Sequence, residues 1–311
     1  MWLAEKFGLR YPIIQGGMSR VATPEFAAAV SNAGALGTLG TGSLRADQVR
    51  DWIHRTRELT DKPFAVNVML MNPESKAIAQ ILVEEKVDVV TTGAGSPGAY
   101  VEAWHSAGIS VIPVVSSLLM AQRMERLGID AVIAEGQEAG GHIGEQTSMT
   151  LWPLLARSLS VPVIAAGGIA HGEEALTVEV MGCQGMQLGT LFLATEECPI
   201  HENYKQAVIN ARESQITAIG RNGGVPCRVM KNRMTREYLR QEKEGADVET
   251  LELLTLGALG KAVTEGDTQY GSLMMGLAAA AIDDILPLAE RLERLMEERD
   301  EALTRFKGRV S

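Results

Sequence analysis

Residues 161–170 read VPVIAAGGIA, and residues 185–193 read GMQLGTLFL. Each segment begins as a β-rich apolar run and contains glycine next to small or polar residues. Strands that are apolar along their whole length are typical of parallel sheets whose two faces are both covered by helices. The two segments therefore predict buried parallel strands that end in tight turns.

The same kind of apolar run recurs toward the N-terminus. Six further apolar runs occupy residues 12–17, 35–40, 64–70, 89–95, 111–116 and 131–136. Amphipathic stretches separate them, and two of these, at 24–34 and 117–128, close with glycine, a common helix stop. Eight alternating strand and helix units predict an α/β fold of the (β/α)8 TIM barrel type. An open doubly wound sheet is the alternative, but no G-x-G-x-x-G follows the first strand.

The alternation of apolar runs and amphipathic stretches ends after Cys198. Residues 199–255 carry many charges and no clear strand, whereas residues 256–307 are again typical of helices. We predict a barrel formed by residues 1–198 and 256–311. Residues 199–255 are predicted to form a small helical, lid-like domain over the barrel mouth.

Composition excludes several classes of function. The net charge of −10 disfavours nucleic acid or an anionic membrane as the main partner. The three cysteines form no C-x-x-C pair, so neither a disulfide framework nor a metal site is expected. The N-terminus has no apolar signal region, and the apolar residues 273–282 are too few to span a membrane. A cytoplasmic protein is expected.

The ends of the last two strands predict a phosphate site. Loops after strands seven and eight of such barrels often hold phosphate through backbone N–H groups. Glycines there let the backbone approach an anion closely. The alternative is that they only turn the chain. The candidate residues at these two strand ends are Ala166, Gly167, Gly168, Gln187, Gly189 and Thr190.

Three other side chains follow or end predicted strands. His142 comes after two glycines beyond the sixth run and suits proton transfer near neutral pH, or it is a loop histidine bonded to backbone. Glu135 ends that run and is either a ligand for sugar-like hydroxyls or half of an ion pair. Asn67 is surrounded by apolar neighbours and needs hydrogen-bond partners, which a flavin ring or a polar layer inside the barrel would supply.

A basic stretch is the last candidate. Residues 221–243 contain seven Lys or Arg side chains against two Glu, in a chain of net charge −10. This asymmetry indicates a docking face for an acidic partner or a polyphosphate, while an ordinary solvated helix is the alternative. The candidate docking residues are Arg221, Arg228, Lys231, Arg233 and Arg236.

These motifs resemble those of a known family. The strings IIQGGM, DKPFAVNVMLMNP, VTTGAGSP, VIAEGQEAGGHIG, VPVIAAGGIA and QLGT resemble the FMN-dependent enoyl-acyl-carrier-protein reductases of the FabK type. That family belongs with the nitronate monooxygenases, also named 2-nitropropane dioxygenases. The resemblance extends from about residue 9 to about residue 287. NVMLMNP, TTGAGSP, KNRMTREYL and GALGKAVTEGD are closer to the FabK branch, whereas the AEGxEAGGHxG motif is common to both branches.

The resemblance implies FMN at the barrel mouth, with its phosphate at the glycine loops. It places the flavin ring near Gly17, Met18, Asn67 and Gly141, and it makes His142 the active-site histidine. It implies NADH-dependent reduction of trans-2-enoyl thioesters of acyl-carrier protein or coenzyme A in fatty acid synthesis. Oxidation of nitronates with FMN and O2 is the alternative, and a non-redox barrel or a protein that only binds FMN is a more distant one. A homodimer is expected, and a monovalent cation is left open.

The chain departs from the FabK pattern at three positions. His171 stands where relatives have Asp, Val225 replaces a histidine over the mouth, and Leu277 replaces a Gln. These departures bear on the substrate and on the cation environment. They leave the predicted FMN-binding residues unchanged.

Overall fold

The computed structural model describes residues 1–223 and 225–310. Eight parallel strands form one sheet in the order β1-β9-β8-β6-β5-β4-β3-β2, and a bridge between Ile14 and Leu36 joins its two edges. The predicted (β/α)8 barrel is therefore confirmed. The strands are β1 (Ile13–Gln15), β2 (Gly37–Gly40), β3 (Phe64–Met69), β4 (Val89–Gly93), β5 (Ser110–Val115), β6 (Val132–Glu135), β8 (Val163–Ala166) and β9 (Met186–Leu188).

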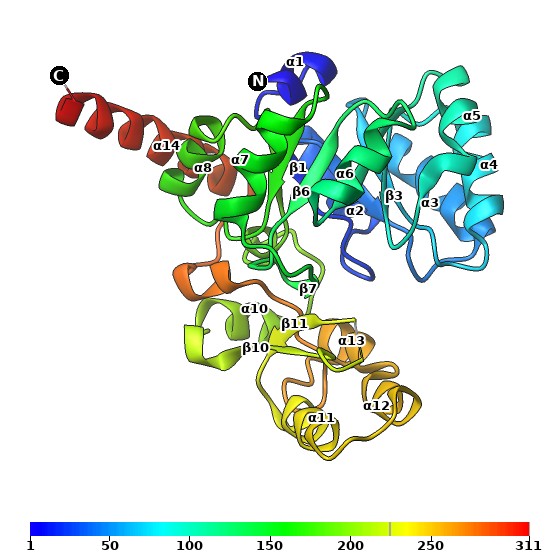
Figure 1. Cartoon of the computed structure of the whole chain (residues 1–311), viewed down its shortest axis with the longest axis vertical. Helices are drawn as coiled ribbons and strands as arrows, with labels where there is room; N and C mark the ends of the chain where they lie inside the picture. The colour runs from blue at the N-terminus through cyan, green and yellow to red at the C-terminus, as the bar shows by residue number, and fades with distance from the viewer. Residues whose placement is uncertain (224, 311) are drawn as a thin grey trace.

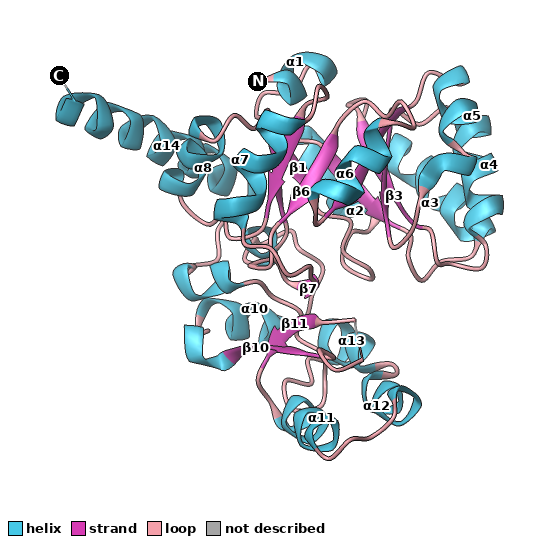
Figure 2. Cartoon of the chain, in the orientation of Figure 1, coloured by secondary structure: helices cyan, strands magenta, loops and turns pink. Residues whose placement is uncertain are grey.

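Helices surround the strands, as Figures 1 and 2 show. The Thr23 hydroxyl caps the second helix by accepting from the Phe26 N–H, and the Ser117 hydroxyl caps the sixth in the same way. The last helix packs along α8 and extends beyond the barrel. The barrel helices are α2 (Pro24–Asn32), α3 (Ala46–Leu59), α4 (Ser75–Glu85), α5 (Val101–Ser106), α6 (Leu118–Glu125), α7 (Ser148–Ser158), α8 (Gly172–Val180), α9 (Thr190–Leu193) and α14 (Leu288–Val310).

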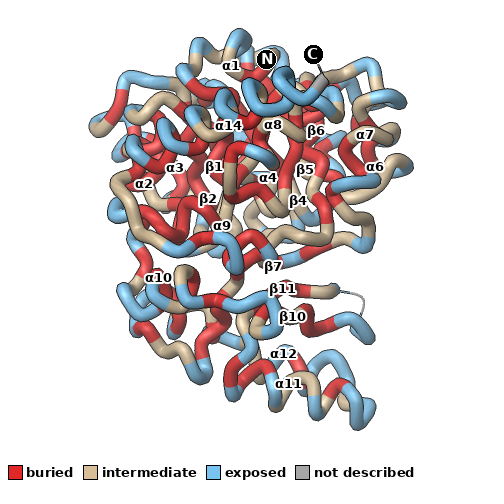
Figure 3. Tube along the Cα trace, turned by 90° about the vertical axis from the view of Figure 1, so that its left-hand side faces the viewer, coloured by how far each residue is buried: buried red, intermediate tan, exposed pale blue. Residues whose placement is uncertain are grey.

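The barrel interior is lined by buried apolar side chains at the end where the strands begin. Figure 3 shows the strands as the most continuously buried part of the chain. The short helix α1 (Trp2–Phe7) closes this end, because its Leu3 is fully buried and the Leu3 N–H donates to the Gln184 carbonyl. The apolar side chains inside this end are Ile14, Leu36, Ala65, Val89, Ile112, Ala131, Ile133 and Ile164.

A second, smaller lobe lies beyond the mouth of the barrel (Figure 1). It contains α10 (Glu202–Ile209), α11 (Arg233–Lys243), α12 (Val248–Thr255) and α13 (Ala258–Gly260). It also contains an antiparallel sheet of β10 (Ile216–Ile219), β11 (Cys227–Met230) and β7 (Gly141–His142). The expectation of no strand in residues 199–255 is therefore wrong. Four-residue strands in a charged segment leave too short a pattern to detect.

The chain returns to the barrel through contacts with both parts. Residues 268–274 hydrogen-bond to the lobe: the Asn232 side-chain amide donates to Gly271, and the Met230 N–H donates to Leu273. A π-helical turn (Lys261–Glu265) and the 3-10 turn η4 (Leu277–Ala281) complete the segment.

The domain boundary after residue 255 stays a prediction. Of the described helices, none is both long and apolar enough to cross a membrane.

Candidate active site

Polar side chains occupy the mouth end of the barrel interior. Side chains alternate along a strand, so a residue two positions after an inward-facing one also faces inward. Leu36, Ala65, Val89 and Ile133 belong to the inner apolar cluster. The positions two residues further along these strands are polar: Thr38, Asn67, Thr91 and Glu135. Gln187 joins them, because its neighbours Met186 and Leu188 pack in the outer core.

Several of these polar groups have spare hydrogen-bonding capacity. The Asn67 amide donates to the Thr91 hydroxyl over 3.0 Å, while the buried Thr38 hydroxyl has no partner among the described residues. Within residues 1–223 and 225–310, the Glu135 and Gln187 side chains also form no hydrogen bond. Buried polar groups in native proteins are normally satisfied. These groups therefore fit a ligand rich in nitrogen and oxygen atoms.

Glu135 has an environment that favours its protonated form. Burial raises the pKa of its carboxyl to about 7. The ion pair considered as an alternative for this residue is not formed with any described cation. A carboxyl that is isolated at the barrel axis can accept hydrogen bonds from ligand hydroxyls or, when protonated, donate one.

Gly17 brings the loop after β1 directly over Asn67. A Cβ atom at Gly17 would lie 2.3 Å from the Asn67 Cβ, so no larger residue fits there. Met18 follows, and its sulfur lies 3.7 Å from the position that a Gly189 Cβ would take. The structure thus brings Gly17 next to Asn67 and Met18 next to Gly189.

The glycine loop after β8 adopts a conformation that other residues avoid. Gly167 and Gly168 have φ values of 95° and 83°. A Cβ at Gly167 would lie 2.9 Å from the Gly136 carbonyl oxygen. Gly189 precedes α9, and the Thr190 hydroxyl accepts a hydrogen bond of 2.8 Å from the Gly276 N–H. The two loops therefore present backbone at the mouth, as a phosphate site requires, and Ala166 is buried just before them.

A small network that sequence reasoning missed supports this glycine loop. The Glu138 carboxylate accepts from the Ser148 N–H and lies 2.8 Å from the Ser148 hydroxyl. That hydroxyl also lies 2.9 Å from the Gly167 carbonyl, and its single proton can serve one of the two acceptors. The loop after β6 is thereby tied to the loop after β8. In the sequence, only the position of Glu138 just after the predicted sixth strand could have indicated this network.

His142 belongs to the sheet of the lobe. In β7 it lies opposite Cys227 of β11, and the preceding Gly141 has a φ of 77°. The imidazole is exposed and has no hydrogen-bond partner among the described residues. Partial desolvation by its surroundings nevertheless lowers its pKa. A neutral imidazole at neutral pH can accept a proton and can also donate its ring N–H.

Arg228 is not available for docking, which corrects the prediction from the sequence. Its side chain is buried, and Nε and Nη2 donate to the Gln137 carbonyl over 3.0 and 2.8 Å. Burial lowers its pKa. Arg228 instead fixes β11 to the barrel loop that leads to His142.

The other predicted docking residues are exposed. Arg233 and Arg236 lie on α11 and form no ion pair with any described residue. Arg221 is similarly exposed, and the Lys231 ammonium donates to the Ser214 carbonyl. Figures 1 and 3 place α11 on the side of the lobe that faces away from the barrel. Helix α11, with Arg233 and Arg236, is therefore remote from the polar end of the barrel.

The three departures from the FabK pattern have different surroundings. His171 Nε2 lies 2.7 Å from the Ala281 carbonyl, and its Nδ1 lies 3.5 Å from the Glu298 carboxylate of α14. The Leu277 N–H donates to the Glu138 carbonyl, while Val225 is exposed. His171 and Leu277 thus join the returning chain to the loops after β8 and β6. Metal ligands are not clustered: no group of three or more His, Cys, Asp or Glu suited to an ion occurs in the described ranges.

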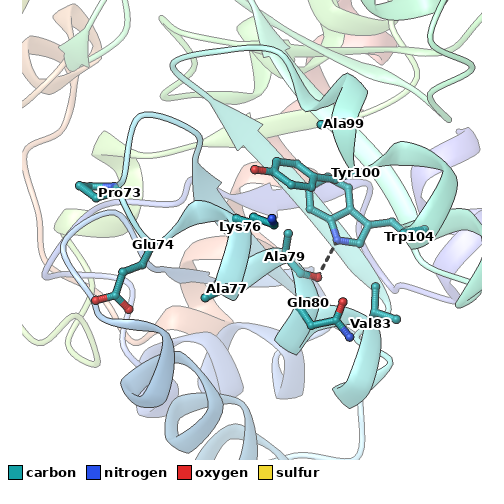
Figure 4. Close-up of a pocket in the computed structure, with 11 residues that line it drawn as sticks. Pro73, Glu74, Lys76, Ala77, Ala79, Gln80, Val83, Ala99, Tyr100 and Trp104 are labelled. Carbon is teal, nitrogen blue, oxygen red and sulfur yellow. Dashed lines mark hydrogen bonds between the residues drawn. The ribbon is translucent and has the colours of Figure 1, made fainter.

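Figure 4 shows a hollow elsewhere on the barrel, between α4 and α5. It has a volume of about 670 Å³, and its lining includes Lys76, Tyr100 and several alanines. At its base the Trp104 indole N–H donates to the Ala79 carbonyl over 3.2 Å. The hollow lies outside the ring of strands. It contains none of the groups that converge at the mouth.

Known proteins share this architecture. The sequence profile described as "Nitronate monooxygenase" matches residues 1–85 and 74–298. Nitronate monooxygenase of Paraburkholderia phytofirmans is 34% identical over 360 aligned positions, which cover 96% of each chain. The structure of FabK from Thermotoga maritima matches with a TM-score of 0.95 and 40% identity over 98% of both chains. Nitroalkane oxidase from Streptomyces ansochromogenes matches with a TM-score of 0.87 and 29% identity, over 98% of this chain and all of the other.

The two solved structures agree with the barrel fold. The profile covers far more than half of the chain, and the Paraburkholderia enzyme is related along nearly its whole length. The chain belongs to the nitronate monooxygenase family and is an FMN-dependent oxidoreductase.

Proposed function

We propose that the enzyme oxidises NADH and reduces the carbon–carbon double bond of trans-2-enoyl thioesters of acyl-carrier protein or coenzyme A. The observation that carries the proposal is the similarity to FabK, which reaches 40% identity and a TM-score of 0.95 over 98% of both chains. The FabK-like strings NVMLMNP and TTGAGSP support it.

The residues at the barrel mouth fit FMN. Gly167 and Gly168 hold positive φ angles that expose backbone for a phosphate, and Glu135, Gln187 and the Asn67 carbonyl oxygen are free to bond a ribityl chain and a flavin ring. We infer that Gly17, Met18 and Gly141 line the ring. Held by these residues, FMN would supply the hydride chemistry that connects NADH with the β-carbon of the thioester.

His142 has the properties for the remaining chemistry. Negative charge develops on the thioester oxygen as the β-carbon is reduced, and a preorganised N–H donor stabilises it. The neutral imidazole can supply this donor. It can then pass a proton to the α-carbon, so that one NADH and one proton are consumed for each double bond reduced.

The second candidate function is oxidation of nitronates with O2. The family profile and the Paraburkholderia relative favour it. Here the lowered pKa of His142 would suit acceptance of an α-proton from the substrate. An acidic carrier protein would play no part, and the exposed Arg221, Arg233 and Arg236 would be ordinary surface residues.

Anaerobic stopped-flow spectroscopy separates the two functions. The purified protein should be yellow and should release FMN, not FAD, on heating. NADH should bleach the flavin within seconds, and crotonyl-coenzyme A should restore its colour. If NADH leaves the flavin oxidised while propionate 3-nitronate reduces it and O2 reoxidises it, the enzyme is a nitronate monooxygenase. A colourless protein that takes up no FMN would contradict both.

A further inference from the structure

Arg20, in the loop after β1, has no role in the proposed chemistry. Arg20 follows Gly17 and Met18 in the loop after β1. The N–H groups of Val21 and Ala22 both donate to the Met18 carbonyl, which folds the loop into a tight turn. Arg20 is exposed in this turn, at the mouth of the barrel.

Arg20 has an unusual backbone conformation. Its φ is 63°, and only Lys86 and Ala94 share a positive φ among the described residues other than glycine. A side chain with a Cβ atom disfavours this left-handed region, and glycine, asparagine or aspartate is the usual occupant. Such strain points to a function when the residue also has a suitable chemical group and position.

The guanidinium of Arg20 has no acidic partner. Across residues 1–223 and 225–310 it forms neither an ion pair nor a hydrogen bond, although other arginines near the barrel surface do, such as Arg45 with Asp47 and Arg55 with Glu25. Arg20 thus places an uncompensated positive charge at the mouth of a chain whose net charge is −10. Its five donors remain available for an anion.

The guanidinium also lies where the barrel meets the lobe. A Cβ on Gly260 of α13 would be 3.6 Å from Arg20 Nη1 and 3.7 Å from Cζ. Figure 1 shows α13 on the barrel side of the lobe, next to the sheet that contains β7. Arg20 therefore spans from the Gly17–Met18 turn of the barrel to α13 of the lobe.

We propose that Arg20 binds the phosphate attached to the nicotinamide ribose of NADH. The inference rests on the proposed function and names the group that recognises its reductant. Three residues span at most about 10 Å, so Arg20 lies close to Met18, which we place beside the flavin ring. This phosphate is the anion of NADH nearest to the carbon that reacts, whereas the phosphates of coenzyme A lie a pantetheine arm away from the thioester. A guanidinium pairs with phosphate through two parallel N–H bonds.

Glycine is the sharpest replacement, because it accepts a φ of 63° without strain and removes only the side chain. Arg20→Gly should raise the apparent Kd for NADH about tenfold, obtained from the concentration dependence of anaerobic flavin bleaching. Reduced nicotinamide mononucleotide keeps this phosphate and should show the same rise. Reduced nicotinamide riboside lacks it, so its apparent Kd should change by less than about twofold.

Lys86 provides a matched control. It is an exposed cation with a φ of 49° at the end of α4, and it precedes β4, so it lies at the closed end of the barrel. Lys86→Gly removes one positive charge and relieves the same type of backbone strain. The apparent Kd for NADH should stay at the wild-type value in this variant.

Two results would overturn the assignment. One is an equal loss of affinity for the mononucleotide and the riboside, which would give Arg20 a structural role. The other is a rise in KM for crotonyl-coenzyme A while KM for an uncharged crotonyl thioester and the apparent Kd for NADH stay the same. That result would show that Arg20 binds the phosphates of coenzyme A instead. If NADH fails to bleach the wild-type flavin, the proposed function is wrong. Titration of the oxidised holoenzyme with nicotinamide mononucleotide and nicotinamide riboside, followed by flavin absorbance, would then decide the role of Arg20 alone.

Discussion

The two ends of the barrel interior are built from the same strands but differ in their side chains. At the closed end, Leu36, Val89 and Ile133 are fully buried among apolar neighbours. Two residues further along are Thr38, Thr91 and Glu135, and the hydroxyl of Thr38 has no partner in the part of the chain that the structure describes. One end therefore contributes only to stability, while the other retains unsatisfied groups for a ligand.

Residues that stabilise the fold and residues that we expect to bind the cofactor are therefore only two positions apart along each strand. Substitutions at the closed end should change the free energy of unfolding and leave the flavin in place. Substitutions at the mouth should change cofactor binding. Single substitutions at each end test that division.

Gly168→Val should give the largest effect, a complete loss of the cofactor. Gly168 has a φ of 83°, and a Cβ there would lie 3.2 Å from the Glu138 Cβ. A β-branched side chain would move the loop and block its approach to a phosphate. The expected product is a colourless protein with native-like circular dichroism. Full FMN occupancy in this variant would place the phosphate elsewhere.

The barrel could be predicted from the sequence because its local pattern is sufficient. Each strand is buried on both faces, so an uninterrupted apolar run marks it, as in Val163–Ala166. Residues at strand ends must then meet at one mouth, which explains why Asn67, Glu135 and Gly168 could be grouped without a structure. Their contacts with FMN remain a prediction.

The lobe could not be predicted in the same way, because distant contacts determine it. Strand β7 has only two residues and exists through pairing with β11, more than 80 positions later in the chain. Arg228 is basic in a basic segment, yet the Gln137 carbonyl 91 positions away makes its burial possible. Neither fact leaves a local pattern. The same is true of the contact between Glu138 and Ser148.

His142→Ala should have the second largest effect. The residue lies in β7 of the lobe sheet, so its removal should leave the glycine loops and the polar barrel end unchanged. A positioned acid–base group typically contributes about 10²–10⁴-fold to the rate. We expect turnover to fall in that range with full flavin occupancy. Turnover at the wild-type rate would assign His142 a structural role.

Ile133→Ala tests the closed end. Ile133 is fully buried in β6, between Val114 of β5 and Ile164 of β8. Truncation of a buried isoleucine to alanine costs about 2–5 kcal/mol in the free energy of unfolding. Urea denaturation should show this loss while the protein still binds FMN in a 1:1 ratio. A variant that lost FMN without losing stability would break the division between the two ends.

Glu135→Gln tests the mouth, two residues along the same strand. The folded apoprotein keeps the proton of Glu135 up to a pH of about 7, whereas the ordinary pKa is 4.5. Between these values the folded state binds more protons than the unfolded state, so stability falls as pH rises. The loss amounts to at most about 3 kcal/mol. The Tm of the wild-type apoprotein should fall from pH 5 to pH 8 relative to that of Glu135→Gln, and parallel profiles would contradict the isolated carboxyl.

The smallest effect is expected from charge reversal on α11, with Arg233→Glu and Arg236→Glu combined. Both side chains are exposed and unpaired with any described acid, but the helix faces away from the barrel mouth. Contacts between exposed charges contribute about 0.2–1 kcal/mol each, so docking of an acidic carrier protein should weaken by only a few-fold. KM for a crotonyl-carrier substrate should rise by about two- to fivefold, while KM for NADH and for crotonyl-coenzyme A stays the same.

Because exposed charges are screened over about 8–10 Å at physiological ionic strength, added salt should remove the difference between variant and wild type. An unchanged KM for the carrier substrate at low salt would show that α11 is an ordinary solvated helix, and that the carrier approaches the mouth from another face.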